Sequence, residues 1–171
     1  SADGQMGPIA APVTVASVPT VPVSVGPRFA YYASTHLGVL APRGWHCFAL
    51  YGSSGSDLLV TPEPHDARDL FRAETKLLGP VVELARVMGG TSGRFHVAEV
   101  AARLFPIAQP FVQQVIAEGL LPKRDFPSGP YKTDVLMRRS DTEVEFVTPG
   151  GKIGVGASDR IAKNSQPIRG V

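Results

Sequence analysis

The single cysteine of the chain, Cys47, is the strongest candidate for a nucleophile. A catalytic thiolate needs a base within hydrogen-bonding reach, and histidine is the usual one. His46 is adjacent, but neighbouring residues of a strand point to opposite faces, so the fold would have to bring His36, His65 or His96 to the thiol. A lone cysteine also excludes an intramolecular disulfide and a cysteine-rich zinc cage. The favoured interpretation of Cys47 is a small, buried core residue that reacts slowly.

A serine is the second candidate nucleophile, in the segment Gly52-Ser53-Ser54-Gly55-Ser56. The segment has the composition of a phosphate-binding loop, but it lacks the Gly-Lys-Ser/Thr ending and precedes an apolar run rather than a helix. It also lacks the Gly-x-Ser-x-Gly pattern of a serine hydrolase. The sequence therefore predicts a β-turn here, and Ser54 is catalytic only if the chain is a hydrolase.

Two carboxylates, Glu143 and Glu145, share one face of a predicted strand, and Asp141 lies two residues before them. Residues two apart on a strand share a face and lie about 6.6 to 7 Å apart, which is compatible with an acid–base pair. The favoured alternative is a solvated strand face that Arg138 or Arg139 neutralises from a neighbouring strand. The histidines show no His-x-His or His-x-x-x-His pair, so no metal and no cofactor are predicted.

The elements that position these residues begin with short apolar runs between residues 29 and 60. Turn-forming segments at 41–44 and 52–57 separate them. We expect the strands of an antiparallel sheet. Both faces of the run 45–51 are mostly apolar, so this strand is predicted to lie inside the sheet.

Helices are predicted from about residue 66 to residue 118. The first rests on an apolar stripe with spacings of four, three and four residues, formed by Leu77, Val81, Leu84 and Met88. A second helix is expected after Thr91 or Ser92, and a third from Pro110 to Gly119. The stripe predicts that Leu84 is a core residue.

The last third returns to strands, at about 134–139 and 142–148, and Gly150-Gly151 then predicts a hairpin with residues 152–155. The order of arm, strands, helices and strands implies an α+β fold, with an antiparallel sheet that carries a helical layer on one face. We expect an extended Pro/Val-rich arm at residues 1–27 and a single α+β domain at residues 28–171.

Composition restricts the partners. The 171 residues include 17 Lys and Arg against 15 Asp and Glu, so a nucleic-acid partner is disfavoured. No apolar run reaches the roughly 18 residues that indicate a membrane span. The arm, in which Asp3 is the one ionisable side chain, alternates valine with proline and small residues. Such an arm can add to a sheet edge of its own chain, or of a second copy to give a homo-oligomer.

Three segments of the chain carry a resemblance to known proteins: Gly44-Trp45-His46-Cys47, Gly52-Ser53-Ser54-Gly55 and Gln166-Pro167-Ile168-Arg169-Gly170-Val171. In these segments the chain resembles uncharacterised secreted or periplasmic proteins of Gram-negative bacteria. It implies export and carries no activity and no site residue. The Ala/Pro/Val-rich opening, which has almost no charge, also favours export, because such openings commonly follow a removed signal peptide.

Three classes of function remain open. We favour a non-catalytic periplasmic or secreted protein that binds another protein or a cell-envelope component, because the sequence contains no assembled catalytic motif. The first alternative is a hydrolase that uses Cys47 or a serine of the 53–56 loop. The second is a small-ligand carrier with an aromatic-lined pocket formed by Trp45, Phe48 and Tyr51.

Overall fold

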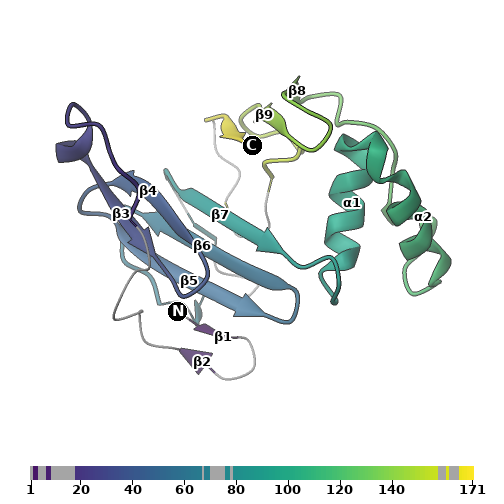
Figure 1. Ribbon diagram of the computed structural model, residues 1–171, viewed down its shortest axis with the longest axis horizontal. Coiled ribbons are helices and arrows are strands. Elements are labelled where there is room, and N and C mark those ends of the chain that lie inside the picture. The colour runs from purple at the N-terminus through teal and green to yellow at the C-terminus, as the bar shows by residue number, and fades with distance from the viewer. Residues whose placement is uncertain are drawn as a thin grey trace. The chain divides into compact units, whose positions relative to one another are not determined.

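The computed structural model describes residues 2–3, 7–8, 18–66, 68–69, 76–77, 79–157, 161 and 166–171, the first four of them by their backbone alone. The chain forms two compact units, residues 1–87 and residues 88–171, and each is described by itself (Figure 1). Antiparallel pairing and two α-helices confirm the predicted α+β class. The single domain predicted for residues 28–171 stays a prediction.

The first unit contains a five-stranded sheet in the order β2-β1-β5-β6-β7. Its long members are β5 (His46–Gly52), β6 (Gly55–Thr61) and β7 (Val82–Val87), which pair antiparallel (Figure 1). Gly52 pairs with Gly55, so Ser53 and Ser54 form the two-residue turn of a hairpin. The sheet order places β5 between β1 and β6, as predicted for an interior strand.

The first strands of the chain are short. β1 (Ala2–Asp3) pairs parallel with β5 and antiparallel with β2 (Gly7–Pro8). The beginning of the predicted arm thus adds to a sheet of its own chain. Residues 9–17 lie outside the described residues, and residues 18–25 form no strand, with Val18 and Val23 exposed.

A separate hairpin pairs β3 (Phe29–Ala33) with β4 (Gly38–Pro42), after the short 3-10 helix η1 (Gly26–Arg28). At the open end of this hairpin, the guanidinium of Arg43 donates hydrogen bonds to the carbonyls of Gly26, Pro27 and Phe29. Together with β5 and β6, these strands confirm the elements predicted between residues 29 and 60.

Both faces of the β5–β6 hairpin contain buried residues, with Ala49, Leu58 and Val60 on the face opposite Phe48. A buried cluster combines Phe48, Leu50, Leu59 and Leu77, and Val81 packs against it. Phe48 and Leu50 are two residues apart on β5 and therefore share a face. Burial of this row is worth about 1.5 to 3 kcal/mol for each large side chain. The two-residue turn fixes the register of the hairpin.

The helix predicted on Leu77, Val81, Leu84 and Met88 is wrong. Residues 82–87 form the strand β7, in which Leu84 pairs with Leu58 of β6. Apolar residues spaced three and four positions apart also occur in a strand in which apolar and polar residues alternate imperfectly. The backbone of β6 forms hydrogen bonds with a neighbouring strand, which a helix at residues 82–87 could not form. Residues 67, 70–75 and 78 of the predicted helix lie outside the described residues.

The second unit contains both predicted later helices, α1 (Arg94–Leu104) and α2 (Gln109–Ala117), joined by η3 (Pro106–Ala108). Pro106 ends α1, and Gly119, with φ of 69°, ends α2 in the left-handed conformation. Their shared core contains Ala98, Ala101, Ala102, Val112, Val115 and Phe126. The short helix η4 (Lys123–Asp125) precedes Phe126. None of the described helices is long and apolar enough to cross a membrane.

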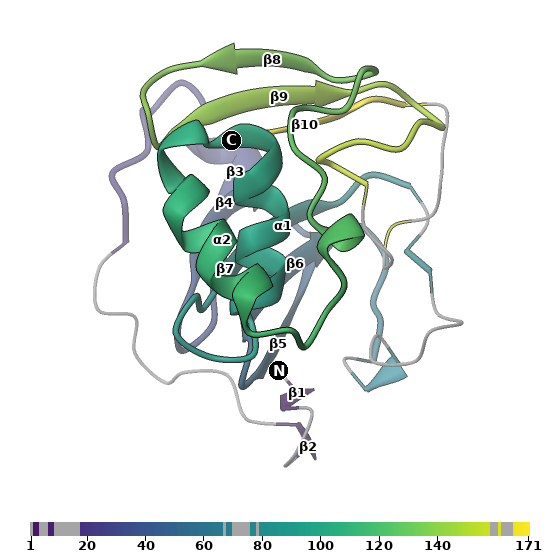
Figure 2. The ribbon, with the colours of Figure 1, turned by 90° about the vertical axis from the view of Figure 1, so that its right-hand side faces the viewer.

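A three-stranded sheet completes the second unit, in the order β10-β9-β8 (Figure 2). Its strands are β8 (Val135–Arg138), β9 (Val144–Thr148) and β10 (Ile168–Gly170). The predicted hairpin at Gly150-Gly151 is wrong, because β9 pairs with β8 and β10, and residues 152–155 form no strand.

A hydrogen-bonded node explains why the segment after β9 does not return as a strand. The carboxylate of Asp134 accepts from the Thr148 hydroxyl and from the Val155 N–H, each at 2.8 Å. The Thr133 hydroxyl donates to the Ile153 carbonyl at 2.7 Å. Backbone groups that a second strand would need are thereby bound to side chains before β8.

Candidate binding groove in the second unit

Cys47 is exposed, which corrects the predicted buried thiol. It lies near the start of β5, where burial begins only at Phe48. Desolvation of its sulfur raises the pKa of the Cys47 thiol above its ordinary value, so the neutral thiol is favoured near pH 7. An activated nucleophile requires the opposite shift.

The candidate bases contact other side chains. His36 packs edge-on against Tyr51, with ring centroids 5.9 Å apart, and His65 packs edge-on against Phe48 at 5.7 Å. Phe48 and Cys47 are adjacent on β5, so their side chains point to opposite faces of the sheet. Ser54 lies exposed in the β5–β6 turn. In the described part of the chain, no three residues among His, Cys, Asp and Glu form a group able to hold a metal.

The three aromatic residues of the carrier hypothesis do not share a face of β5. Phe48 belongs to the buried cluster, while Tyr51, three positions later, lies on the other face. Trp45 precedes the strand and is half-buried.

Of the three alternating carboxylates, Glu145 on β9 is neutralised by Arg139, one of the two arginines that the favoured interpretation named. Arg139 donates two hydrogen bonds to Glu145, both of 2.8 Å. This pairing lowers the pKa of Glu145, which keeps the carboxylate ionised. Asp141 and Glu143 are exposed.

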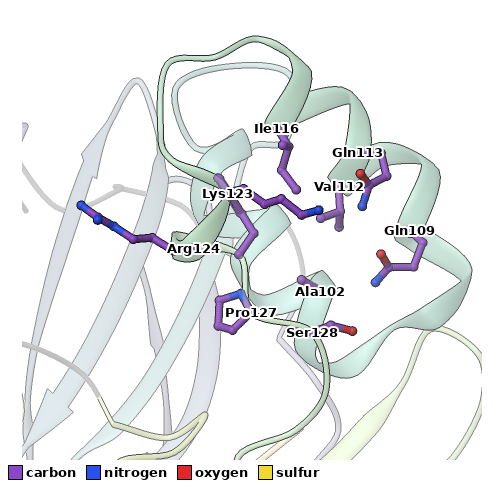
Figure 3. Close-up of a pocket in the computed structure, with 10 residues that line it drawn as sticks. Ala102, Gln109, Val112, Gln113, Ile116, Lys123, Arg124, Pro127 and Ser128 are labelled. Atoms are coloured by element: carbon purple, nitrogen blue, oxygen red, sulfur yellow. The ribbon is translucent and has the colours of Figure 1, made fainter.

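A cavity of about 660 Å³ lies in the second unit, between the two helices and the segment that follows α2 (Figure 3). We call it the α2 groove, and it is lined by Ala102, Gln109, Val112, Gln113, Ile116, Lys123, Arg124, Phe126, Pro127 and Ser128. Its size falls in the range of about 300 to 1,000 Å³ that is usual for ligand sites.

The base of the α2 groove is apolar and the edge is polar. Ala102, Val112 and Phe126 are buried core residues. Gln109 and Gln113 are four residues apart on α2 and therefore stand side by side on one face of that helix. Figure 3 shows both amides directed toward the opposite wall. Each amide carries a donor and an acceptor, so the edge can hydrogen-bond a backbone or a carboxylate.

Two neighbouring cations differ in direction. Lys123 extends across the α2 groove toward α2, whereas the side chain of Arg124 points away from it (Figure 3). Arg124 also lies 4.0 Å from the carboxylate of Asp125. Lys123 is therefore the cation that the groove presents. None of the lining residues is acidic or a histidine, so the arrangement suits binding rather than acid–base chemistry.

An ion pair fixes the two helices that form the groove. Arg94, the first residue of α1, donates to both carboxylate oxygens of Glu118, just after α2, at 2.7 to 2.9 Å. This geometry raises the pKa of Arg94 and lowers that of Glu118. Arg94 also donates to the Thr91 carbonyl and lies over the ring of Phe95. A bidentate pair at this position restrains the angle between the helices.

The sequence predicted α2 but not its groove. The apolar stripe of α2 was recognisable, and the glutamines beside it, four residues apart, were the available signal. Lys123 and Phe126 follow the helix in a segment for which no element was predicted, and their approach to α2 depends on tertiary packing.

Comparisons with protein-family models, with curated proteins and with solved structures find no match to this chain.

Proposed function

We propose that the protein is a non-catalytic binding protein that holds an acidic, partly apolar segment of another protein in the α2 groove. The observation that carries the proposal is the position of Lys123, which reaches across an apolar base toward a pair of amides (Figure 3). Apolar side chains of the bound segment would cover Val112 and Phe126. A carboxylate would meet the ammonium of Lys123.

The composition of the groove supports a peptide ligand over a small metabolite. Specific small-ligand sites usually enclose their ligand and converge several polar groups on it. Here the polar groups are two amides, one ammonium and the exposed Ser128, spread along an edge. Such an edge suits the repeating backbone groups of an extended or helical segment.

The proposal places the protein in the periplasm or outside the cell. Its support is the resemblance to exported proteins that the three segments of the sequence carry. The partner in that compartment would be a protein or a protein component of the cell envelope with an exposed acidic segment.

The test is a titration with a synthetic peptide of alternating leucine and glutamate, observed by NMR of the full chain. We expect the side-chain amide signals of Gln109 and Gln113 to shift with a saturable dependence on peptide concentration. Salt should weaken the binding, because the contact to Lys123 is electrostatic.

The matched peptide has glutamine in place of each glutamate. It should bind more weakly, since it retains the apolar contacts but loses the charge. Equal binding of the two peptides, or saturable shifts confined to residues outside the α2 groove, would contradict the proposal.

A further inference from the structure

The strand β8 forms an edge of the sheet in the second unit. In the order β10-β9-β8, one side of β8 pairs with β9 and the other has no strand partner among the described residues (Figure 2). Such an edge presents unpaired backbone groups and is a template for another strand.

Two of the three exposed side chains of β8 are apolar, and the third is that of Arg138. Val135 is 66% exposed and Met137 is 51% exposed. They are two residues apart and share one face of β8, opposite the face of Leu136 and Arg138. Natural edges are usually protected by charges or by proline, and this stretch of β8 has neither on that face.

The backbone of β8 defines which groups point outward. The Arg139 N–H donates to the Glu143 carbonyl on the β9 side at 2.9 Å. Hydrogen-bonding directions alternate along an antiparallel strand. Leu136 and Arg138 therefore direct their N–H and carbonyl groups toward the free edge.

We propose that β8 pairs antiparallel with β8 of a second copy of this chain, about a two-fold axis at Leu136. In this register Leu136 lies opposite its own copy, and Val135 lies opposite Met137 of the other chain. Asp134 then lies opposite Arg138. Every cross-strand pair is apolar with apolar or acidic with basic, and such pairs stabilise sheets.

The charges that meet in this pairing are not already neutralised by an ion pair. Asp134 accepts from a hydroxyl and a backbone N–H, and Arg138 donates to the carbonyls of Leu104 and Ser140. All four partners are neutral. No described residue forms a salt bridge with Asp134 or Arg138.

The neighbouring register is less complementary. A shift of the axis to Met137 would place Arg139 opposite Val135 and Arg138 opposite Leu136, so each charge would face an apolar side chain. Self-complementarity of a single patch is what a two-fold interface requires. Because β8 has only four residues, we expect a weak, reversible dimer rather than an obligate one.

The test combines molar mass with site-specific crosslinking, in the full chain with Cys47→Ser to remove the native thiol. Leu136→Cys places two thiols on directly opposed residues, about 5.5 Å apart between Cα atoms, within the reach of a disulfide. Met137→Cys is the matched control, because in this register it faces Val135 of the other copy. Sedimentation from micromolar to millimolar concentration measures the dimer without any crosslink.

We expect mass to rise with concentration, and Leu136→Cys to form a disulfide-linked dimer at least about tenfold faster than Met137→Cys, since only the first pair has disulfide geometry. Val135→Lys should abolish the rise in mass by placing a charge in the apolar row. A monomeric mass throughout, or crosslinking that is equal or faster at Met137→Cys, would overturn the proposal. An unchanged rise in mass with Val135→Lys would also overturn it.

Discussion

At the scale of single residues, Asp134 shows how one side chain determines the course of a whole segment. Its carboxylate binds Thr148 on β9 and the backbone of Val155 beyond it, and the Gly156 N–H donates to the same Thr148 hydroxyl at 3.0 Å. The node leaves no room beside Gly154, because a Cβ there would lie 2.6 Å from the Thr148 side chain and closer still to Asp134.

Gly154→Ala is therefore expected to destabilise the protein by about 1 to 3 kcal/mol, the usual cost of forcing extra volume into a packed site. Gly90→Ala is the matched control, since nothing lies within 4 Å of a Cβ built there. Urea unfolding of both variants measures the difference. Equal urea midpoints for the two variants would show that the hydrogen-bonded node can rearrange without loss of stability.

The exposed thiol of Cys47 leads to a second prediction. A thiol reagent should label native protein completely, without prior unfolding, because the residue is exposed. Labelling near neutral pH should nevertheless be slower than in urea, since the raised pKa of Cys47 lowers its thiolate fraction. The two rates should converge as pH rises above the folded-state pKa. Labelling that occurs only on unfolding would restore the buried interpretation.

At the scale of elements, the core of the first unit rests on β6. Leu59→Ala should cost about 2 to 5 kcal/mol, because Leu59 is fully buried in the cluster with Phe48 and Leu50. Leu84→Ala should cost less, since Leu84 is only half-buried on β7. Urea unfolding at constant pH compares them. A larger loss from Leu84→Ala would contradict the assignment of residues 82–87 to a strand at the margin of the core.

The two helices of the second unit lead to a prediction about pH. The hydrogen bonds from Arg94 lower the pKa of Glu118 in the folded state. Their stabilising effect is present above the unfolded pKa and is lost as pH falls through the folded pKa. The melting temperature of Glu118→Gln should thus lie below that of the parent at neutral pH and approach it in acid.

Glu99→Gln on α1 is the control for that measurement, because Glu99 forms no ion pair within the described residues. The difference in melting temperature between Glu99→Gln and the parent should stay the same as pH falls. The corresponding difference for Glu118→Gln should become smaller. A pH-independent gap for Glu118→Gln would mean that the pair with Arg94 does not form in solution.

How far the sequence predicts each element depends on whether its partner is local. The β5–β6 hairpin and both α-helices follow from turn residues, alternation and helical stripes within about twenty residues, so they were predictable. Residues 82–87 satisfy a helical spacing but pair with β6, and that partner lies outside their own pattern. Gly150-Gly151 has the composition of a hairpin turn, but Asp134 binds the segment that follows. In both cases a tertiary contact overrides a local preference.

At the scale of the whole molecule, the candidate site was the least predictable part. The sequence predicted candidate catalytic residues at Cys47, at the histidines and in the 52–57 turn. Catalysis there would require a contact between a nucleophile and a histidine, and the described structure does not form one. The α2 groove instead combines glutamines, a lysine and core side chains, which are common residues with no motif. The charge that the groove presents depends on the direction of two adjacent side chains, because Lys123 faces the apolar base and Arg124 points away from it (Figure 3).

The most direct measurement of the central claim is the affinity for the leucine–glutamate peptide in two charge-reversal variants. Lys123→Glu should weaken binding about five- to tenfold, because one partly exposed charge contact is replaced by a repulsion. Arg124→Glu makes the same change of net charge one residue away, but on a side chain that points out of the groove, and should change the affinity less than about twofold. Equal losses in the two variants would indicate nonspecific attraction, and unchanged affinity in Lys123→Glu would show that the α2 groove does not bind the acidic segment.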